Sequence, residues 1–217
     1  DVETKQVERV AEAVGAEIAQ DEKRDVAAPC IFPIPPTLYL GMDGTGVPMR
    51  KSELDGRQGK QQDGSAKTRE VKICTIWSAE SRDKEGTPTR DDGSVTYSAA
   101  IESAATRDTD DRPSEFAERV LREAGRRGFD RARRRVVLGD GAPWIWNLAE
   151  EHFPGAIQIL DRFHAKQHLS EVAKAIHGAT SDPGKQWARQ RHDELDSGKI
   201  SAVFPAVAGH AASSEEA

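Results

Sequence analysis

Two aspartates follow apolar segments that are predicted strands, and a glycine follows each aspartate. Asp43 comes after residues 37–42, and Asp140 comes after residues 135–139. Ligands of open α/β sheets gather at strand ends, and two neighbouring carboxylates repel each other unless a divalent cation neutralises them. Oxygen ligands select Mg²⁺ or Mn²⁺, and such ions assist in-line displacement at phosphorus. The pattern predicts a metal-dependent phosphoryl-transfer site, with ordinary Asp-Gly turns as the alternative.

A third aspartate is followed by two histidines. Asp161 comes after the apolar segment 156–160, and His164 and His168 are four residues apart, on one face of a predicted helix. With Asp161 they form a candidate zinc site, although no glutamate follows His164 as the zinc-protease pattern requires. The alternatives are a structural or exposed histidine pair, and a His164 that packs beside acidic residues and donates a hydrogen bond to them.

Arginine is concentrated in residues 119–135. This segment holds eight arginines and two acids, a local charge of +6 in a chain whose net charge is −6. Arginine suits phosphate because its planar guanidinium donates two parallel hydrogen bonds, so the segment predicts sequence-independent, salt-dependent DNA binding. A solvated helix face and loop is the alternative. The candidate DNA contacts are Arg126, Arg127, Arg131, Arg133, Arg134 and Arg135.

The elements that would hold these residues alternate between strand and helix in the second half of the chain. Hydrophobic periodicity predicts helices at 2–24, from 114 to about 125–128, and at 143–153, 163–176 and 185–195, and strands at 37–42, 71–77, 135–139 and 156–160. Residues 47–50 are a candidate second strand, and 95–100 are ambiguous. This order predicts an α/β fold of the RNase H-like kind, with a mixed five-stranded sheet flanked by helices.

We expect three parts along the chain. Residues 1–36 form a helix and a proline-rich linker, 37–178 the core, and 179–217 the start of a helical insertion with a disordered tail. Residues 201–217 show no periodic pattern, and 213–217 are typical of disorder. The first residues already have helical spacing, which suggests a fragment of a longer protein.

Composition excludes several classes of protein. A net charge of −6 on 217 residues is too small for a disordered polyelectrolyte. No apolar run reaches 18 residues, which argues against a membrane span, and the N-terminus has no secretory signal. The two cysteines, Cys30 and Cys74, cannot form a disulfide framework. They are consistent with a reduced, cytoplasmic compartment.

Three separated strings resemble one known family. They are Met42-Asp43-Gly44-Thr45-Gly46-Val47-Pro48, Gly139-Asp140-Gly141-Ala142-Pro143-Trp144 and Asp161-Arg162-Phe163-His164. Between about Leu38 and Gly178 the chain resembles bacterial insertion-sequence DDE transposases of the ISKra type. In that family an aspartate on the first strand, an aspartate after the fourth strand and a later glutamate hold the catalytic metal. The resemblance assigns the first two roles to Asp43 and Asp140.

The resemblance also implies cofactors, partners and a location. It implies Mg²⁺ or Mn²⁺ as cofactor, transposon terminal repeats and target DNA as partners, a homo-oligomer in the full-length protein, and a place near the bacterial nucleoid without membrane contact. Asp161 and His164 resemble the aspartate-x-x-histidine signature of Mutator-like and related transposases.

The third acid of the family has no clear counterpart. The family's glutamate lies beyond a helical insertion, and this chain ends before any motif that matches it; Glu171 and Glu194 are available outside a recognisable context. We therefore expect an incomplete fragment that does not cleave DNA by itself. The alternatives are a non-catalytic DNA-binding remnant and a zinc-dependent hydrolase that uses Asp161, His164 and His168.

Overall fold

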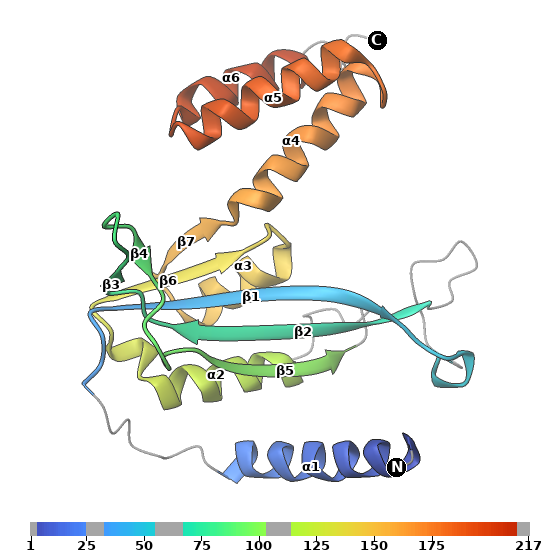
Figure 1. Cartoon of the computed structure of the whole chain (residues 1–217), viewed down its shortest axis with the longest axis vertical. Coiled ribbons are helices and arrows are strands. Elements are labelled where there is room, and N and C mark those ends of the chain that lie inside the picture. The colour runs from blue at the N-terminus through green and yellow to red at the C-terminus, as the bar shows by residue number, and fades with distance from the viewer. Residues whose placement is uncertain (1–3, 25–32, 55–66, 103–113, 212–217) are drawn as a thin grey trace. The chain divides into compact units, whose positions relative to one another are not determined.

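The computed structural model describes residues 4–24, 33–54, 67–102 and 114–211. These residues divide into two compact units, 1–159 and 160–217, here called the sheet unit and the helical unit (Figure 1). The predicted boundary after residue 178 differs from this division, because α4 (Arg162–His177) packs against α5 (Asp182–Asp196) and so belongs with the C-terminal helices.

The sheet unit is built on one mixed five-stranded sheet with the strand order β5-β2-β1-β6-β7 (Figure 1). Its strands are β1 (Thr37–Pro48), β2 (Thr68–Trp77), β5 (Thr96–Glu102), β6 (Arg134–Gly139) and β7 (Ile157–Leu160). β1 pairs antiparallel with β2 and parallel with β6, and β2 pairs antiparallel with β5. The predicted α/β fold with a mixed five-stranded sheet is therefore confirmed. The two short strands β3 (Ser81–Arg82) and β4 (Pro88–Thr89) pair in a hairpin between β2 and β5.

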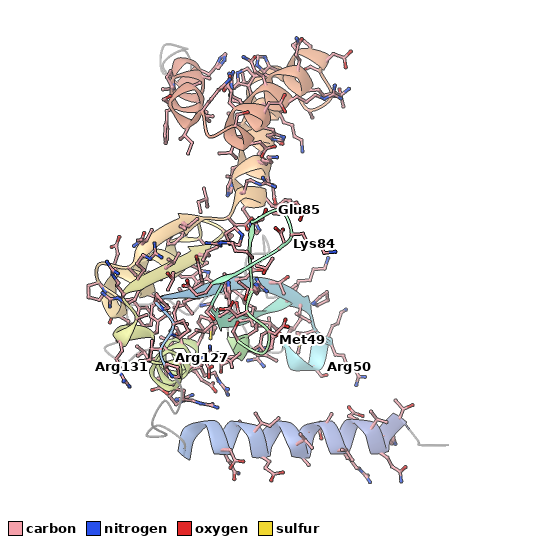
Figure 2. The ribbon with its side chains drawn as sticks, turned by 60° about the vertical axis from the view of Figure 1, so that its left-hand side comes forward. Met49, Arg50, Lys84, Glu85, Arg127 and Arg131 are labelled. Carbon is pink, nitrogen blue, oxygen red and sulfur yellow. The ribbon has the colours of Figure 1, made fainter. Side chains whose placement is uncertain are left out.

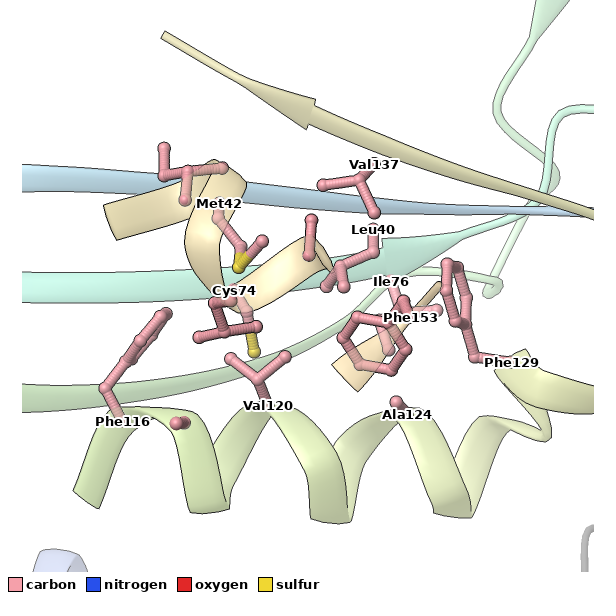
Figure 3. Packing of buried hydrophobic residues seen from close by; sticks show 14 of the residues in the cluster. Leu40, Met42, Cys74, Ile76, Phe116, Val120, Ala124, Phe129, Val137 and Phe153 are labelled. Atoms are coloured by element: carbon pink, nitrogen blue, oxygen red, sulfur yellow. The ribbon is translucent and has the colours of Figure 1, made fainter. Parts of the chain in front are cut away.

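One face of the sheet is covered by α2 (Glu115–Arg127) and α3 (Pro143–His152). Leu38, Leu40 and Met42 alternate along β1 and are buried on this helix face, as the two-residue period of a strand requires. On α2, Phe116 and Val120 are four residues apart and fully buried against them (Figure 3). Each fully buried side chain of this size contributes about 1.5–3 kcal/mol of hydrophobic free energy.

The ends of α2 follow from its capping residues. Ser114 lies at the N-cap, where its hydroxyl accepts a hydrogen bond of 3.0 Å from the amide of Ala117. Gly128 ends the helix with a φ of 65°, a left-handed conformation that glycine adopts without steric cost. The predicted start and end of this helix are therefore confirmed. The short 3₁₀ helix η2 (Phe129–Arg131) leads on to β6.

The structure corrects three predicted elements. β1 does not stop before Asp43 but runs on to Pro48, because β2 pairs with it as far as Thr68; residues 47 and 48 therefore extend β1 instead of starting a second strand. The ambiguous segment 95–100 is largely part of β5. Residues 201–211, which show no periodic pattern in the sequence, belong to α6 (Ile200–Ala211). Residues 213–217, predicted to be disordered, lie outside the described part of the chain.

The remaining helices agree with the periodicity of the sequence. α1 (Thr4–Arg24) carries an apolar stripe of exposed side chains, Val7, Val10, Val14 and Ile18. The helical unit consists of α4, α5 and α6. There the rings of His177 and Trp187 lie with centroids 6.3 Å apart, and the ring of His210 contacts both. Within the described ranges, no helix is both long enough and apolar enough to cross a membrane.

Candidate active site

Asp43 lies in the interior of β1, on the sheet face opposite the helices. Its neighbours Met42 and Leu40 point into the core, so alternation directs the Asp43 side chain to the other face, where it is exposed. One carboxylate oxygen, Oδ1, accepts a hydrogen bond of 2.7 Å from the amide of Gly44. The prediction that this acid ends a strand is wrong, because the ladder with β2 continues beyond it, with Asp43 opposite Ile73.

Asp140 directly follows β6 and begins the turn into α3. Its Oδ1 accepts a hydrogen bond of 2.8 Å from the amide of Ala142, so the turn chemistry considered for Asp-Gly is present here. Gly141 has a φ of 100°, which explains the glycine after the acid. The predicted end of a strand at this acid is confirmed.

β1 and β6 carry the two aspartates toward the same end of the central strand pair. The parallel register runs from Thr37 opposite Arg134 to Gly41 opposite Leu138. Asp43 stands two residues further along β1, and Asp140 stands two residues after Leu138, directly after β6 ends. Neighbouring strands are about 4.8 Å apart, so a register continued by two residues would bring Asp140 opposite Asp43, on the side of the sheet to which Asp43 points. We call this side of the sheet the carboxylate face.

Each carboxylate keeps one oxygen for a ligand. Among the described residues, neither Oδ2 has a hydrogen-bond partner, since the local backbone amides engage Oδ1 in both aspartates. Two carboxylates form a smaller donor set than a complete metal cage: within the described ranges, no group of three or more His, Cys, Asp or Glu side chains is placed to hold a metal.

The glycine after Asp43 serves the opposite face of the sheet. A Cβ at Gly44 would lie 2.9 Å from Oε1 of Glu70 and 3.4 Å from Cζ2 of Trp144. The buried Lys72 lies over the same Trp144, with Nζ 4.7 Å from the ring centroid. Gly44 therefore makes room for side chains on the helix face.

A stacked aromatic pair that the sequence motifs do not identify shares the carboxylate face. Tyr39 and Trp77 stack with ring centroids 5.5 Å apart, and the guanidinium of Arg90 lies 4.5 Å from the Trp77 ring centroid. A Cβ at Gly41 would lie 3.0 Å from this indole, so the glycine between Tyr39 and Asp43 allows the ring to lie on the sheet. The available signal was the two-residue period that joins Tyr39, Gly41 and Asp43.

Asp161 and His164 have a local structural role at the start of α4. Asp161 is the N-cap, and its Oδ1 accepts hydrogen bonds from the amides of Phe163 at 2.8 Å and His164 at 3.1 Å. The Nδ1 atom of His164 lies 3.3 Å from the same oxygen. The acid beside His164 is therefore Asp161 itself. Both residues belong to the helical unit, whereas Asp43 and Asp140 belong to the sheet unit.

The zinc site considered for Asp161, His164 and His168 is not formed. These three described residues do not make a group that could hold a metal. Instead, Nδ1 of His168 lies 3.6 Å from Oε2 of Glu171, and both side chains are more than half exposed. The physical reason is that Asp161 turns toward the backbone amides that open α4.

Both candidates for the third acid make contacts within the helical unit. Glu194 accepts hydrogen bonds of 2.7 and 2.6 Å from Arg191, whose side chain is buried. These hydrogen bonds hold the pKa of Glu194 below its ordinary value. Glu171 accepts a hydrogen bond of 3.1 Å from Gln167. Both glutamates stand in the helical unit.

Several of the candidate DNA-binding arginines are engaged within the chain. Arg127 donates to the carbonyl of Ser94 and to Oγ1 of Thr96, and Arg126 lies 3.6 Å from the buried Glu123. Successive residues of β6 face opposite sides of the sheet. Arg135 turns to the helix face and donates to the carbonyl of Pro154.

Three of the candidate DNA-binding arginines are exposed to solvent. Arg134 lies on the carboxylate face, where its Nε donates to Oγ1 of Thr37 and the residue as a whole is exposed. Arg131, near the end of α2 in Figure 2, and Arg133 are both exposed. In the part of the chain that the structure describes, neither makes an ion pair or a side-chain hydrogen bond.

Comparisons with known proteins leave the site to be judged on its own geometry. No protein family, no curated protein and no solved structure matches this chain.

Proposed function

We propose that the sheet unit is the RNase H-like core of a DDE-type DNA transposase, which cleaves and joins DNA at insertion-sequence ends with Mg²⁺ or Mn²⁺. The observation that supports the proposal is the parallel β1–β6 register, which runs to Gly41 opposite Leu138, two residues before Asp43 and Asp140. The strand order, with an antiparallel β2 and a parallel β6 on either side of β1, supports the same fold.

The donor chemistry of the pair fits a hydrated magnesium ion. Mg²⁺ keeps several water ligands and is usually held by one or two carboxylates together with substrate phosphates. The free Oδ2 atoms of Asp43 and Asp140 supply such carboxylate oxygens. When bound, the ion would stabilise charge on the reacting phosphate. The two aspartates would hold it in place. Water would attack the phosphorus and displace the 3′-oxygen at the transposon end, and the freed 3′-hydroxyl would then attack a target phosphate and displace the target's 3′-oxygen, without a covalent protein–DNA intermediate.

A second candidate function is DNA binding without catalysis. It is favoured by the two-carboxylate donor set, because the described residues include no third acid beside Asp43 and Asp140. A third carboxylate restricts the position of the ion, and misplacement by about 1 Å can cost on the order of 10²-fold in rate. We therefore expect the 217-residue chain by itself to nick DNA only at background level.

Metal binding tests the aspartate pair directly. Titration with Mn²⁺, followed by the loss of its solution EPR signal, should show a weak site in the native chain. Asp43→Asn and Asp140→Asn should each lower the affinity at least tenfold, because each removes one charged donor of two. Asp92→Asn is the matched control, since Asp92 is exposed and lies elsewhere on the sheet unit. Equal Mn²⁺ binding in all four proteins would refute the proposed site.

A nicking assay separates the two functions. Metal-dependent nicking of terminal-repeat DNA that Asp140→Asn abolishes would establish a catalytically competent core. Binding of the same DNA without nicking would establish the DNA-binding alternative.

Salt dependence tests the arginines. The joint substitutions Arg131→Ala and Arg133→Ala should reduce the slope of log affinity against log salt by up to about 1.8, at about 0.9 for each phosphate contact. Arg122→Ala is the control, since Arg122 lies 3.7 Å from Glu118 and is mostly shielded. An unchanged slope would mean that Arg131 and Arg133 face away from DNA.

A further inference from the structure

A cavity of about 230 Å³ lies between α4 and α5, within the helical unit alone. Its floor is made of small residues, which include Ala173, Gly184 and Ala188. Gly184 is needed there, because a Cβ would lie 2.9 Å from Oγ of Ser181 and 3.1 Å from Cβ of His177. One water needs only about 15 Å³ of such volume, so the cavity has room for a larger polar group.

The charged residues that line the cavity are all basic. Lys174 comes from α4, and Lys185 and Arg189 come from α5; among the described residues that line it, none is acidic. Ser170 and Ser181 line the same hollow, but the Ser170 hydroxyl donates to the carbonyl of Lys166 at 2.9 Å and Oγ of Ser181 accepts from the amide of Gly184 at 3.1 Å. The three cations around one hollow match the needs of a phosphate group, which accepts hydrogen bonds on all its oxygens.

The placement of two of these cations is unfavourable in the isolated protein. Lys185 stands near the N-terminus of α5, where the helix dipole repels positive charge. Arg189 is four residues further on the same helix face, so the two like charges also repel each other. Lys185 pairs with Asp182 at 3.0 Å, but both side chains are largely exposed and such a pair contributes little. Lys174, in the last turn of α4, is favourably placed and needs no such explanation.

We propose that this cavity binds a phosphate group and that the group belongs to the DNA backbone. The assignment to DNA rests on the proposed function, whereas the preference for phosphate rests on the cavity itself. The site lies in a different unit from Asp43 and Asp140, so it adds a second point of attachment that does not depend on metal. Solvated surface cations, each contacting its own phosphate, are the alternative.

The number of phosphates that the three cations neutralise distinguishes a cavity site from independent surface contacts. The salt slope of DNA binding counts neutralised phosphates, at about 0.9 for each. Three cations that converge on one phosphate should contribute about 0.9 in total, whereas three independent contacts should contribute about 2.7. The joint variant Lys174→Ala, Lys185→Ala and Arg189→Ala should therefore lower the slope by about 0.9 and the affinity at 0.1 M salt by about eightfold.

Two single variants make the test specific for the cavity. Ala188→Leu fills the hollow without changing any charge, and it should reproduce the effect of the triple variant. Lys199→Ala removes a cation from the same unit outside the cavity lining, and it should leave the slope unchanged. Circular dichroism of each variant confirms that the helices are intact. The measurements use the full chain and a duplex of at least 20 base pairs.

A second arm identifies the source of the phosphate. Inorganic phosphate, added at constant ionic strength, should shift the amide NMR signals of residues 178–185 in a saturable way, and Ala188→Leu should abolish the shift. A slope change near 2.7 in the triple variant, with no effect of Ala188→Leu, would overturn the proposal that the cavity binds one phosphate group. Phosphate binding with an unchanged DNA slope would overturn the assignment to DNA. Loss of the proposed metal site would show instead in the Mn²⁺ titration of Asp43 and Asp140 variants, so the two failures are distinguishable.

Discussion

Replacing Gly139 with alanine should separate β6 from α3 and displace the start of the turn that holds Asp140. A Cβ at Gly139 would lie 2.7 Å from Cγ2 and 2.9 Å from Cδ1 of Ile145, which is fully buried. Insertion of a methyl group into a packed core costs about 1–3 kcal/mol. The gain from replacing a strand glycine by alanine is about 0.5–1 kcal/mol. The steric cost is larger than this gain, so we expect Gly139→Ala to lower the free energy of unfolding by about 1–2 kcal/mol.

The assay is thermal and urea unfolding of the full chain. For a protein of this size, 1 kcal/mol corresponds to about 2–4 °C in Tm, so Gly139→Ala should lower the Tm of the sheet unit by about 2–8 °C. Because the clash is with Ile145, the cost should disappear when that side chain is shortened. In an Ile145→Ala background, Gly139→Ala should be neutral or stabilising, although Ile145→Ala alone should cost about 2–5 kcal/mol.

A double-mutant cycle gives the result that would refute this reasoning. Additive free energies for the two substitutions would mean that the Gly139 Cβ does not meet Ile145 and that the contact between β6 and α3 is looser than described. The matched control is Gly125→Ala on α2, where a Cβ meets nothing within 4 Å. That substitution should stabilise the protein by up to about 1 kcal/mol, because alanine has the higher helix propensity.

Three further predictions concern the helices. Hydrogen bonds from Arg191 and Lys166 hold the pKa values of Glu194 and Asp196, respectively, below their ordinary range. The stabilisation from these two carboxylates is therefore complete above their unfolded pKa values of about 4 and is lost as the pH falls through the folded values. An acid titration of helicity checks this. Arg191→Ala should lower the Tm of the helical unit more than Lys199→Ala, since only Arg191 is buried against a carboxylate. Ser114→Ala should cost about 1 kcal/mol in urea unfolding by removing the N-cap of α2.

The elements that bury one face could be predicted from the sequence. Leu38, Leu40 and Met42 alternate in period two, and Phe116 and Val120 repeat in period four, so the core strand and its helix follow from periodicity alone. The extension of β1 past Asp43 could not be predicted in this way. It depends on pairing with β2, which begins only at Thr68, with 19 residues between the two strands, and Gly44, Thr45 and Gly46 have no strand-forming pattern.

The candidate site could likewise be predicted from the sequence only in part. Asp43 and Asp140 stand out by their local context, whereas the parallel pairing of the strands that carry them depends on the whole sheet. The spacing of Asp161 and His164 is explained by helix capping, a local effect that a motif alone does not distinguish from catalysis. The basic cavity of the helical unit could not be predicted from the sequence, because Lys174 and Arg189 come from two helices and line one cavity only when α4 packs on α5.

The last strand of the sheet has a consequence for how this protein behaves at high concentration. β7 is at the edge of the sheet, and its apolar side chains Ile157, Ile159 and Leu160 are 52%, 41% and 45% exposed. An edge strand offers a row of backbone donors and acceptors to any other extended chain, and apolar side chains on it favour such pairing. Its length of four residues limits the number of backbone bonds a second chain can make. Strand addition between copies at β7 should therefore limit the colloidal stability of the purified protein. Ile159→Lys should improve solubility while leaving the fold unchanged.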